Sequence, residues 1–300
     1  MQLQSISKLT VPQIQAIENL AQRCSLTDGN SVPIYRHLLE NDRPFPCGML
    51  AVADEQLIGF LRAFFFAENE VELSMMVAPT HRRQGLATAM LQQLLPIIQS
   101  QDVKTLNITV PYDLNTEWLT QLGFHLTGVQ YQMQHQPQVA VAESKLADNH
   151  LIRLATTDDL PYLTAIHRAG FPTESSEIAD YLNMLVTDAN HRIFIIEASG
   201  LPVGKAHVRF QGDVAYLADI AVFPKHQSKG HARALIKHCL HLLQSTHASN
   251  IFLDLEAHNA RAQEIYLDLG FAIINTHQCW STAINFAEFN LTDFLKHTQE

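Results

Sequence analysis

The chain has 300 residues, of which 47% are hydrophobic and 17% are charged, and its formal net charge is −10. This length favours two domains, and the composition is that of a globular protein rather than a disordered or collagen-like one. The negative charge disfavours binding to nucleic acid or acidic lipid, and no segment approaches the ~18 consecutive apolar residues of a membrane-spanning helix. A surface of this sign is compatible with a cationic acceptor such as an amine.

The N-terminal ten residues lack the apolar core of a signal peptide. The four cysteines, Cys24, Cys47, Cys239 and Cys279, form no CxxC pair, and a chain of this length does not depend on disulfides. We therefore expect reduced thiols and a cytoplasmic location.

Sixteen histidines raise the question of a metal site. His238 and His241 lie three positions apart on a predicted helix, so they could share one of its faces. No HExxH motif or Cys/His cluster supplies the further ligands that a metal ion needs. We therefore expect scattered surface histidines and no metal.

An internal repeat organises the chain. Gly59 and Gly204 close two similar segments 145 positions apart, and Gly85 and Gly230 keep the same offset. The segments Leu122-Gly123-Phe124 and Leu269-Gly270-Phe271 match at an offset of 147. A repeat of this length is too long for a solenoid unit and indicates two whole domains.

The elements of the second half are predicted in chain order. A strand over 151–154 precedes a helix that begins near Thr157 and carries Leu160, Leu163 and Ile166 on one face. Extended segments follow at 192–197, 204–210 and 216–222, then a helix over 230–243, a strand over 251–255 and a helix over 260–269. Gly270 suits the C-terminus of that last helix.

Strands mixed with helices at this spacing predict an α/β fold, in the α+β form with a mixed sheet, in each half. The predicted organisation is an N-terminal domain over 1–135, a polar linker over 136–149 and a C-terminal domain over 150–300.

Two loops carry the chemical signal, one over 77–87 and one over 222–232. In each, a strand stops at a proline, a polar loop follows, and a glycine opens a helix. A helix N-terminus presents unpaired N–H groups and the positive end of the helix dipole, so it favours an anion such as a diphosphate. Neither loop matches the nucleotide-binding patterns GxxxxGK[ST] or GxGxxG.

These loops resemble a signature of the GCN5-related N-acetyltransferases (GNAT). Arg82-x-x-Gly85-x-Ala87 and Gln227-x-x-Gly230-x-Ala232 are similar to the family's (Arg/Gln)-x-x-Gly-x-(Gly/Ala), which follows a strand ending in Val-x-Pro. The resemblance covers most of both halves. It implies two tandem acyl-CoA N-acyltransferase domains that use acetyl-CoA, whose diphosphate binds the loop amides and whose pantetheine arm pairs with the strand end.

The resemblance implies coenzyme-binding residues in both halves. In the first half they are Met75, Met76, Val77, Arg82, Arg83, Gln84, Gly85, Leu86 and Ala87. In the second half they are Ile220, Ala221, Val222, Gln227, Ser228, Lys229, Gly230, His231, Ala232 and Asn259.

Acyl transfer to an amine requires an acid for the leaving thiolate and a path for the amine proton. The resemblance implies that Tyr266, four residues before Gly270, is the acid, and that Asp254, five residues before Asn259, is the base. Helical spacing equally allows Tyr266 to be a core residue, and strand alternation allows Asp254 to lie on a solvated face. Asp219, in the strand before the loop, is another candidate carboxylate.

The first half departs from this pattern. Leu119 stands four residues before Gly123 and cannot donate a proton, and the segment from Asn115 to Gly123 is shorter than the one from Asn259 to Gly270. We therefore expect a coenzyme pocket without transfer chemistry in the first half. Glu70 and Glu72 are candidate bases there, with a solvated strand edge as the alternative.

The sequence predicts an acetyl-CoA-dependent N-acetyltransferase whose acceptor is a small-molecule or peptide amine, with the chemistry in the C-terminal half. The alternative is a non-catalytic acyl-CoA-binding or regulatory protein with two coenzyme pockets. The acceptor loops are expected near 171–178. A monomer that forms a pseudo-dimer and a homodimer both remain open.

Overall fold

A computed structural model describes residues 1–39, 42–67, 69–114, 116–136, 150–171, 178–246, 248 and 250–284. These residues form two compact units. The first consists of 1–131, 256–258 and 275 onward, and the second of 132–255 and 259–274. Each unit has the mixed α/β fold that the sequence predicted.

The first unit is built on a mixed sheet in the order β1-β2-β3-β4-β5-β12. The strands from its own half are β1 (Gln2–Ile6), β2 (Gly48–Ala53), β3 (Gln56–Ala67), β4 (Glu70–Val77), β5 (Thr105–Pro111) and β6 (His125–His135). The helices are α1 (Val11–Asp28), α2 (Arg36–Leu39), α3 (Leu86–Gln99) and α4 (Thr116–Gln121). Neighbours from β1 to β4 are antiparallel, whereas β4 and β5 are parallel.

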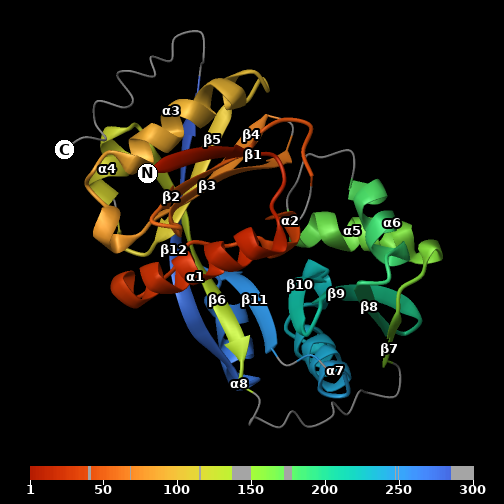
Figure 1. Ribbon diagram of the computed structural model, residues 1–300. Helices are drawn as coiled ribbons and strands as arrows, with labels where there is room; N and C mark the ends of the chain where they lie inside the picture. Colours follow the sequence, from red (N-terminus) through yellow and green to blue (C-terminus); the bar gives the residue numbers. More distant parts are fainter. Residues whose placement is uncertain are drawn as a thin grey trace. The chain divides into compact units, whose positions relative to one another are not determined.

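Helices cover both faces of this sheet (Figure 1). On one face, α3 presents a buried stripe that includes Met90, Leu94 and Ile98, and the Met90 side chain packs directly over Gly59 of β3. The other face carries α1 and the segment before α2, where the ring of Tyr35 meets Phe64 of β3 edge-on at 5.1 Å between centroids. Spacing of three and four residues places such side chains on one side of a helix, which is why the helix packs there.

The second unit repeats this arrangement. Its strands are β7 (His150–Leu154), β8 (His191–Ala198), β9 (Leu201–Gln211), β10 (Val214–Val222) and β11 (Asn250–Glu256), and its helices are α5 (Leu160–Gly170), α6 (Ile178–Thr187), α7 (His231–Gln244) and α8 (Ala260–Asp268). The sheet order is β11-β10-β9-β8-β7, in which only the β10–β11 pair is parallel.

Alternation along β8 divides its side chains between two layers. Ile193 and Ile195 pack with Leu163 of α5 and Leu182 of α6. Phe194 points the other way and meets the His238 ring of α7 at 4.8 Å between centroids. Period-two alternation in a strand therefore supplies both faces of the unit with apolar contacts.

Each unit takes part of its last strand from the other half of the chain. β12 (Phe271–Ala283) pairs antiparallel with β5 of the first unit, from His277 opposite Pro111 to Ala283 opposite Thr105. The end of β6 belongs to the second unit, where Gln134 Nε2 donates to Asn250 Oδ1 at 2.7 Å. The sequence did not predict this exchange.

The predicted elements of the second half are all present, with ends that differ by a few residues. The helix predicted near Thr157 begins as a short 3-10 turn over Thr157–Asp159 that leads into α5. Asp159 stabilises this start by accepting hydrogen bonds from the Thr156 amide at 2.8 Å and from Arg153. Most of the predicted linker, 137–149, and positions 172–177 of the predicted acceptor loop lie outside the described residues.

All four cysteines are free thiols, and Cys24, Cys47 and Cys239 are buried. Among the described helices, none has the length and hydrophobicity required to cross a membrane.

Candidate functional site

The loop after β4 forms a concave run of backbone amides at the start of α3. Arg83 and Gly85 both have left-handed backbone conformations, with φ of 61° and 76°, and Gly85 is the N-cap of α3. Left-handed residues interleaved with right-handed or extended ones turn successive N–H groups toward one point, which suits an anion. A Cβ built on Gly85 meets nothing within 4 Å, so the space in front of the loop is open.

The loop after β10 repeats this geometry 145 positions later. Ser228 and Gly230 have φ of 62° and 83°, and Gly230 is the N-cap of α7. A Cβ on Gly230 likewise meets nothing within 4 Å. Both loops therefore combine a helix N-terminus with open space for a phosphate group.

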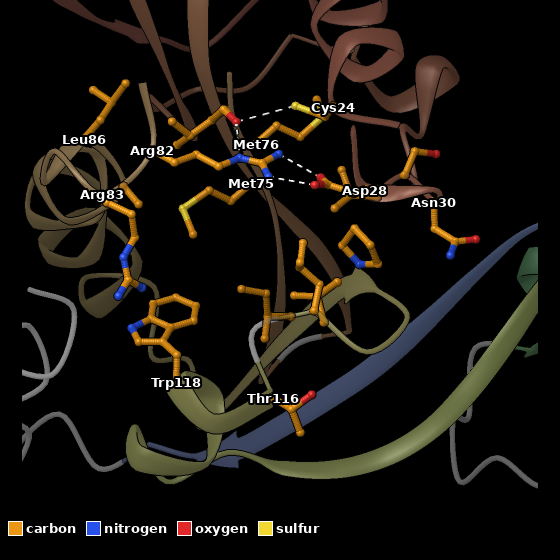
Figure 2. Close-up of a pocket in the computed structure, with 18 of the residues that line it drawn as sticks. Cys24, Asp28, Asn30, Met75, Met76, Arg82, Arg83, Leu86, Thr116 and Trp118 are labelled. Carbon is orange, nitrogen blue, oxygen red and sulfur yellow. Dashed lines mark hydrogen bonds and ion pairs between the residues drawn. The ribbon is translucent and has the colours of Figure 1, made fainter. Parts of the chain in front are cut away.

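The first residue of each signature holds its loop against the preceding strand. Arg82 Nε donates to the carbonyl of Val77 at 3.0 Å, and Gln227 Nε2 donates to the carbonyl of Val222 at 3.1 Å. Arg82 also forms two hydrogen bonds of 2.7 Å with the carboxylate of Asp28, and this pairing raises its pKa (Figure 2). These side chains thus shape the loop, and the backbone remains available for a ligand.

In both units the two parallel strands separate beside this loop. β4 pairs with β5 only from Glu70 to Leu73, although β4 continues to Val77. β10 pairs with β11 only from Val214 to Tyr216, although β10 continues to Val222. The unpaired strand ends leave backbone N–H and C=O groups free to bind an extended ligand.

A cavity of about 760 Å³ occupies this position in the first unit. Its walls come from the end of α1, the end of β4, the start of α3, the end of β5 and α4. Figure 2 shows Arg82 turned toward Asp28 at one end, with Arg83 and Trp118 toward the other. The volume suits a cofactor-sized ligand.

Most of the residues predicted to bind coenzyme in the first half line this cavity. They are Met75, Met76, Val77, Arg82, Arg83, Gly85, Leu86 and Ala87. Gln84 is not among the lining residues, and its side chain donates to the carbonyl of Thr80 at 3.2 Å. Asp28, Asn30 and Trp118 also line the cavity, and the sequence analysis did not identify them as binding residues because no local motif marks them.

In the second half, the predicted coenzyme residues lie on β10, the following loop and the start of α7. At the end of β10, a β-bulge between Ala218 and Ala221 contains Ile220, and regular pairing with β9 resumes at Ala221 and Val222. Lys229 is exposed, whereas the His231 ring is buried. His231 Nδ1 donates to the carbonyl of His226 at 3.0 Å, so the buried ring helps to hold the loop against the start of α7.

The two predicted residues that follow β11 lie on or beside α8. Asn259 is the N-cap of α8, and its side-chain oxygen accepts a hydrogen bond from the Ala262 amide at 3.2 Å. Tyr266 is buried, and burial raises the pKa of its phenol to about 12. Its ring contacts Phe271 edge-on at 5.7 Å between centroids. The phenol therefore carries its proton at neutral pH.

The two candidate carboxylates of the second unit have opposite environments. Asp254 is exposed at the surface, yet the protein around it partly desolvates the carboxylate and raises its pKa, while the charge of Arg209 opposes the rise. Asp219 lies in the bulge of β10 with φ of 48°, and its Oδ2 is 3.6 Å from His207 Nδ1 and 3.8 Å from Lys205 Nζ. Burial opposes ionisation of Asp219, but these two partners outweigh it and lower its pKa to about 2. Asp254 is therefore the better base of the two.

The first unit has no equivalent of Tyr266 at the matching position. Leu119 stands there, fully buried in α4, which has 6 residues against 9 in α8. Asn115 lies outside the described residues. A different group is notable in this unit: Glu72 accepts hydrogen bonds of 3.0 Å from Tyr35 and from Thr109, and burial raises its pKa.

The described residues contain no cluster of three or more His, Cys, Asp or Glu side chains placed to hold a metal ion. His238 packs on Phe194 instead, and burial lowers its pKa.

Comparison with known proteins gives a match in each half. The model of the "Acetyltransferase (GNAT) family" matches residues 14–124 and 157–271. No curated protein matches the chain in sequence.

Solved structures share the two-unit architecture along nearly the whole chain. A GCN5-related N-acetyltransferase from Sphaerobacter thermophilus superposes with a TM-score of 0.77 at 16% identity, over 93% of this chain and 95% of that one. A tandem GNAT protein from the clavulanic acid biosynthesis pathway gives 0.68 at 13% identity, over 94% and 98%. A GCN5-related N-acetyltransferase from Kribbella flavida gives 0.58 at 12% identity, over 92% and 98%. At such low sequence identities, the similarity shows a shared fold and nothing more specific.

Proposed function

Because the chain belongs to the acetyltransferase (GNAT) family, we propose that it transfers an acetyl group from acetyl-CoA to a primary amine, with the chemistry in the second unit. The family consists of N-acetyltransferases, and both units carry the loop geometry that suits a diphosphate. The observation that supports the second unit most directly is Tyr266, a buried phenol that keeps its proton at neutral pH.

The proposed reaction assigns each proton to a group. The amine nitrogen bonds to the thioester carbonyl carbon, the carbon–sulfur bond breaks, and Tyr266 gives its phenolic proton to the departing thiolate. The amine loses one proton to Asp254, and exchange with solvent restores both side chains. The raised pKa of Asp254 brings this carboxylate closer to the pH at which it acts. Asn259 caps the start of α8.

The first unit has a cavity of about 760 Å³ beside its loop but no proton donor at the position of Tyr266, where Leu119 stands. We assign it the second candidate function, coenzyme binding without transfer. A small-molecule or peptide amine is the proposed acceptor of the second unit.

Calorimetric titration of acetyl-CoA tests this division. Glutamate at Gly85 or Gly230 would project a bulky anion into the open space at the loop, so Gly85→Glu should abolish binding in the first unit and Gly230→Glu in the second. The matched control is Gly200→Glu, because Gly200 also has a positive φ of 77° and open space around its Cβ but lies in the turn between β8 and β9.

We expect two acetyl-CoA sites in the wild-type protein and in the control. Each loop variant should lose one of them. A single site lost only in Gly85→Glu would overturn the assignment of chemistry to the second unit. Folded protein that binds no acetyl-CoA at all would overturn the proposed function.

A further inference from the structure

A buried lysine lies beside the bulge of β10, and the proposed reaction does not use it. Lys205 of β9 is fully buried, and its ammonium lies 3.8 Å from Oδ2 of Asp219. The same oxygen lies 3.6 Å from Nδ1 of His207, which is also buried. Burial lowers the pKa of Lys205, and the charge of Asp219 opposes this change. Because a buried ammonium needs a compensating carboxylate, Lys205 and Asp219 depend on each other.

The backbone of Asp219 has an unusual conformation at this place. Its φ of 48° lies in the left-handed region, which residues other than glycine seldom adopt. Such a conformation persists only where the surrounding structure enforces it. Lys205 and His207 both come from β9, and both hold the carboxylate of Asp219. These two side chains therefore fix the bulge from the neighbouring strand.

The end of α5 packs directly against the same bulge. A Cβ built on Gly170 would lie only 2.7 Å from the Cβ of Ala221, so this position has no room for a side chain. The next residue, Phe171, places its ring centroid 5.8 Å from the ammonium of Lys205. The close approach of α5 thus accounts for the burial of Lys205 and holds the bulge from its other side.

The bulge releases backbone groups where the strands of the second unit separate. β9 pairs with Ala218 and with Ala221 but not with the two residues between them, Asp219 and Ile220. The pairing of β10 with β11 already ends at Tyr216. In these three strands, which are described throughout, the backbone of the bulge therefore lies outside both ladders and can bind a ligand. Acyl transfer needs such a donor, because negative charge develops on the thioester oxygen.

The first unit has no such bulge at the matching place. The residues 145 positions before Lys205, His207 and Asp219 are Phe60, Arg62 and Ser74. There β3 and β4 pair without interruption from Gly59 to Phe64, with Arg62 directly opposite Ser74. Ser74 is buried, and its hydroxyl donates to the carbonyl of Pro33 at 3.1 Å. A regular ladder thus replaces the bulge and its charged contacts.

We propose that Lys205 and His207 are positioning residues of the second unit, which act through Asp219 to hold the bulge of β10 where its backbone donates to the thioester carbonyl of acetyl-CoA. This role presupposes the proposed function. It also gives the first unit a second reason, besides Leu119, to bind coenzyme without transfer, because its uninterrupted ladder offers no bulge at this place.

The test is carbon-13 NMR of acetyl-CoA labelled at the acetyl carbonyl carbon. The ligand is bound to the full-length Gly85→Glu variant, in which only the second-unit site should remain. A hydrogen bond to the carbonyl oxygen polarises the carbonyl, so the bound resonance should lie downfield of free acetyl-CoA. Lys205→Met should cancel most of this shift. Its affinity for acetyl-CoA, measured by calorimetry, should change by less than about threefold, because the diphosphate loop keeps its own contacts.

The matched control is Lys237→Met, which removes a lysine charge from α7 of the same unit and should leave the shift and the affinity unchanged. A second variant, Asp219→Asn, removes the carboxylate but keeps a residue type that tolerates the left-handed conformation. It should lose the shift as Lys205→Met does, and it provides the test if Lys205→Met fails to fold.

The double variant Lys205→Met/Asp219→Asn separates positioning from stability. Neither charge is then left unpaired, so the melting temperature should recover relative to the single variants. The carbonyl shift should not recover, because nothing holds the bulge. A shift that returns together with the melting temperature would assign these residues to folding alone and overturn the proposal.

The first unit supplies an internal comparison. Acetyl-CoA bound to the Gly230→Glu variant, in which only the first-unit site should remain, should have a carbonyl resonance near that of the free ligand. Equal downfield shifts in the two units, no shift in the second unit, or an unchanged shift in Lys205→Met and Asp219→Asn would contradict the proposed role. Folded Gly85→Glu protein that binds no acetyl-CoA would instead overturn the proposed function, and the positioning role with it.

Discussion

Arg82 and Gln227 differ in charge, yet each side chain donates to the last carbonyl of the strand before its loop. The geometry requires a long side chain with an N–H donor and does not require a positive charge. This explains in physical terms why the signature accepts either residue type at this position. Only Arg82 adds an ion pair, with Asp28.

The role of Tyr266 is testable by removing one atom. Tyr266→Phe keeps the ring contact with Phe271 and deletes the proposed acid. We expect kcat to fall by about 100-fold with little change in KM, because general acid catalysis acts on the transition state. Steady-state kinetics with acetyl-CoA and an acceptor amine measure this.

The matched control for this substitution is Tyr162→Phe, which removes a phenol oxygen from the exposed surface of α5. It should leave both kinetic constants unchanged. An unchanged kcat in Tyr266→Phe would assign Tyr266 to the core, the alternative that helical spacing allows.

At this scale the sequence predicted the residues that a local motif marks. Gly85 and Gly230 could be identified because a positive φ at a helix start favours glycine. The environment of Glu72 could not be predicted, since its hydrogen-bond donors come from two other segments, Tyr35 before α2 and Thr109 in β5. Such long-range partners leave no periodic signal in one chain.

Among the elements, β12 has an unexpected role in the first unit. Asn275 is buried, with an exposed fraction of 6%, and exchanges hydrogen bonds with Ser31 in both directions, at 2.9 and 3.1 Å. Thr276 donates through its amide to Asn30 at 2.8 Å. Asn30 and Ser31 line the cavity of the first unit, so a C-terminal strand holds one of its walls.

We expect Asn275→Ala to weaken acetyl-CoA binding in the first unit by about threefold to tenfold. The substitution removes the hydrogen-bond partners of the Ser31 amide and carbonyl, which should destabilise this wall of the cavity by about 1–2 kcal/mol. The measurement is calorimetric titration in the Gly230→Glu background, where only the first-unit site should remain.

The control is Thr282→Ala, further along β12 and opposite Leu106. It should not alter this site. Equal affinities of the two variants would show that the Asn275 contacts do not position the cavity wall.

The positions of the helices and strands were more predictable from the sequence than the side-chain contacts or the pairing of the strands. Hydrophobic periodicity and the repeat located the strands and helices of the second half, because each unit buries its own apolar stripes. The pairing of β12 with β5 could not be predicted, because the two strands lie in different halves of the chain and no local motif marks which strand a long-range partner will join.

For the whole molecule, lowering the pH should reduce the stability of the two units by different amounts. The described residues of the second unit include six histidines whose pKa is lowered, chiefly by burial: His135, His167, His191, His226, His231 and His238. Among the described residues of the first unit, His277 is the one such histidine, with a pKa lowered to about 4.

A lowered histidine pKa means that, as the pH falls, the histidine is protonated in the unfolded chain at a higher pH than in the folded protein. The stability that the neutral histidines contribute to the folded state is fully present above the unfolded-state pKa of about 6.5. It declines as the pH falls toward the pKa values of the folded state. We therefore expect the second unit to lose more hydrogen-exchange protection than the first between pH 7.5 and pH 5.5, after correction for intrinsic exchange rates. Equal losses in both units would contradict this expectation.

The exchange of last strands also bears on how the protein is made. A chain leaving the ribosome releases β1 to β5 first, and the strand that pairs with β5, β12, emerges only after all the other strands, from β6 to β11, have been made. The unit encoded first is therefore the one finished last. During synthesis the edge of β5 stays open until β12 emerges, and in that interval the β12 of a second nascent chain has access to it.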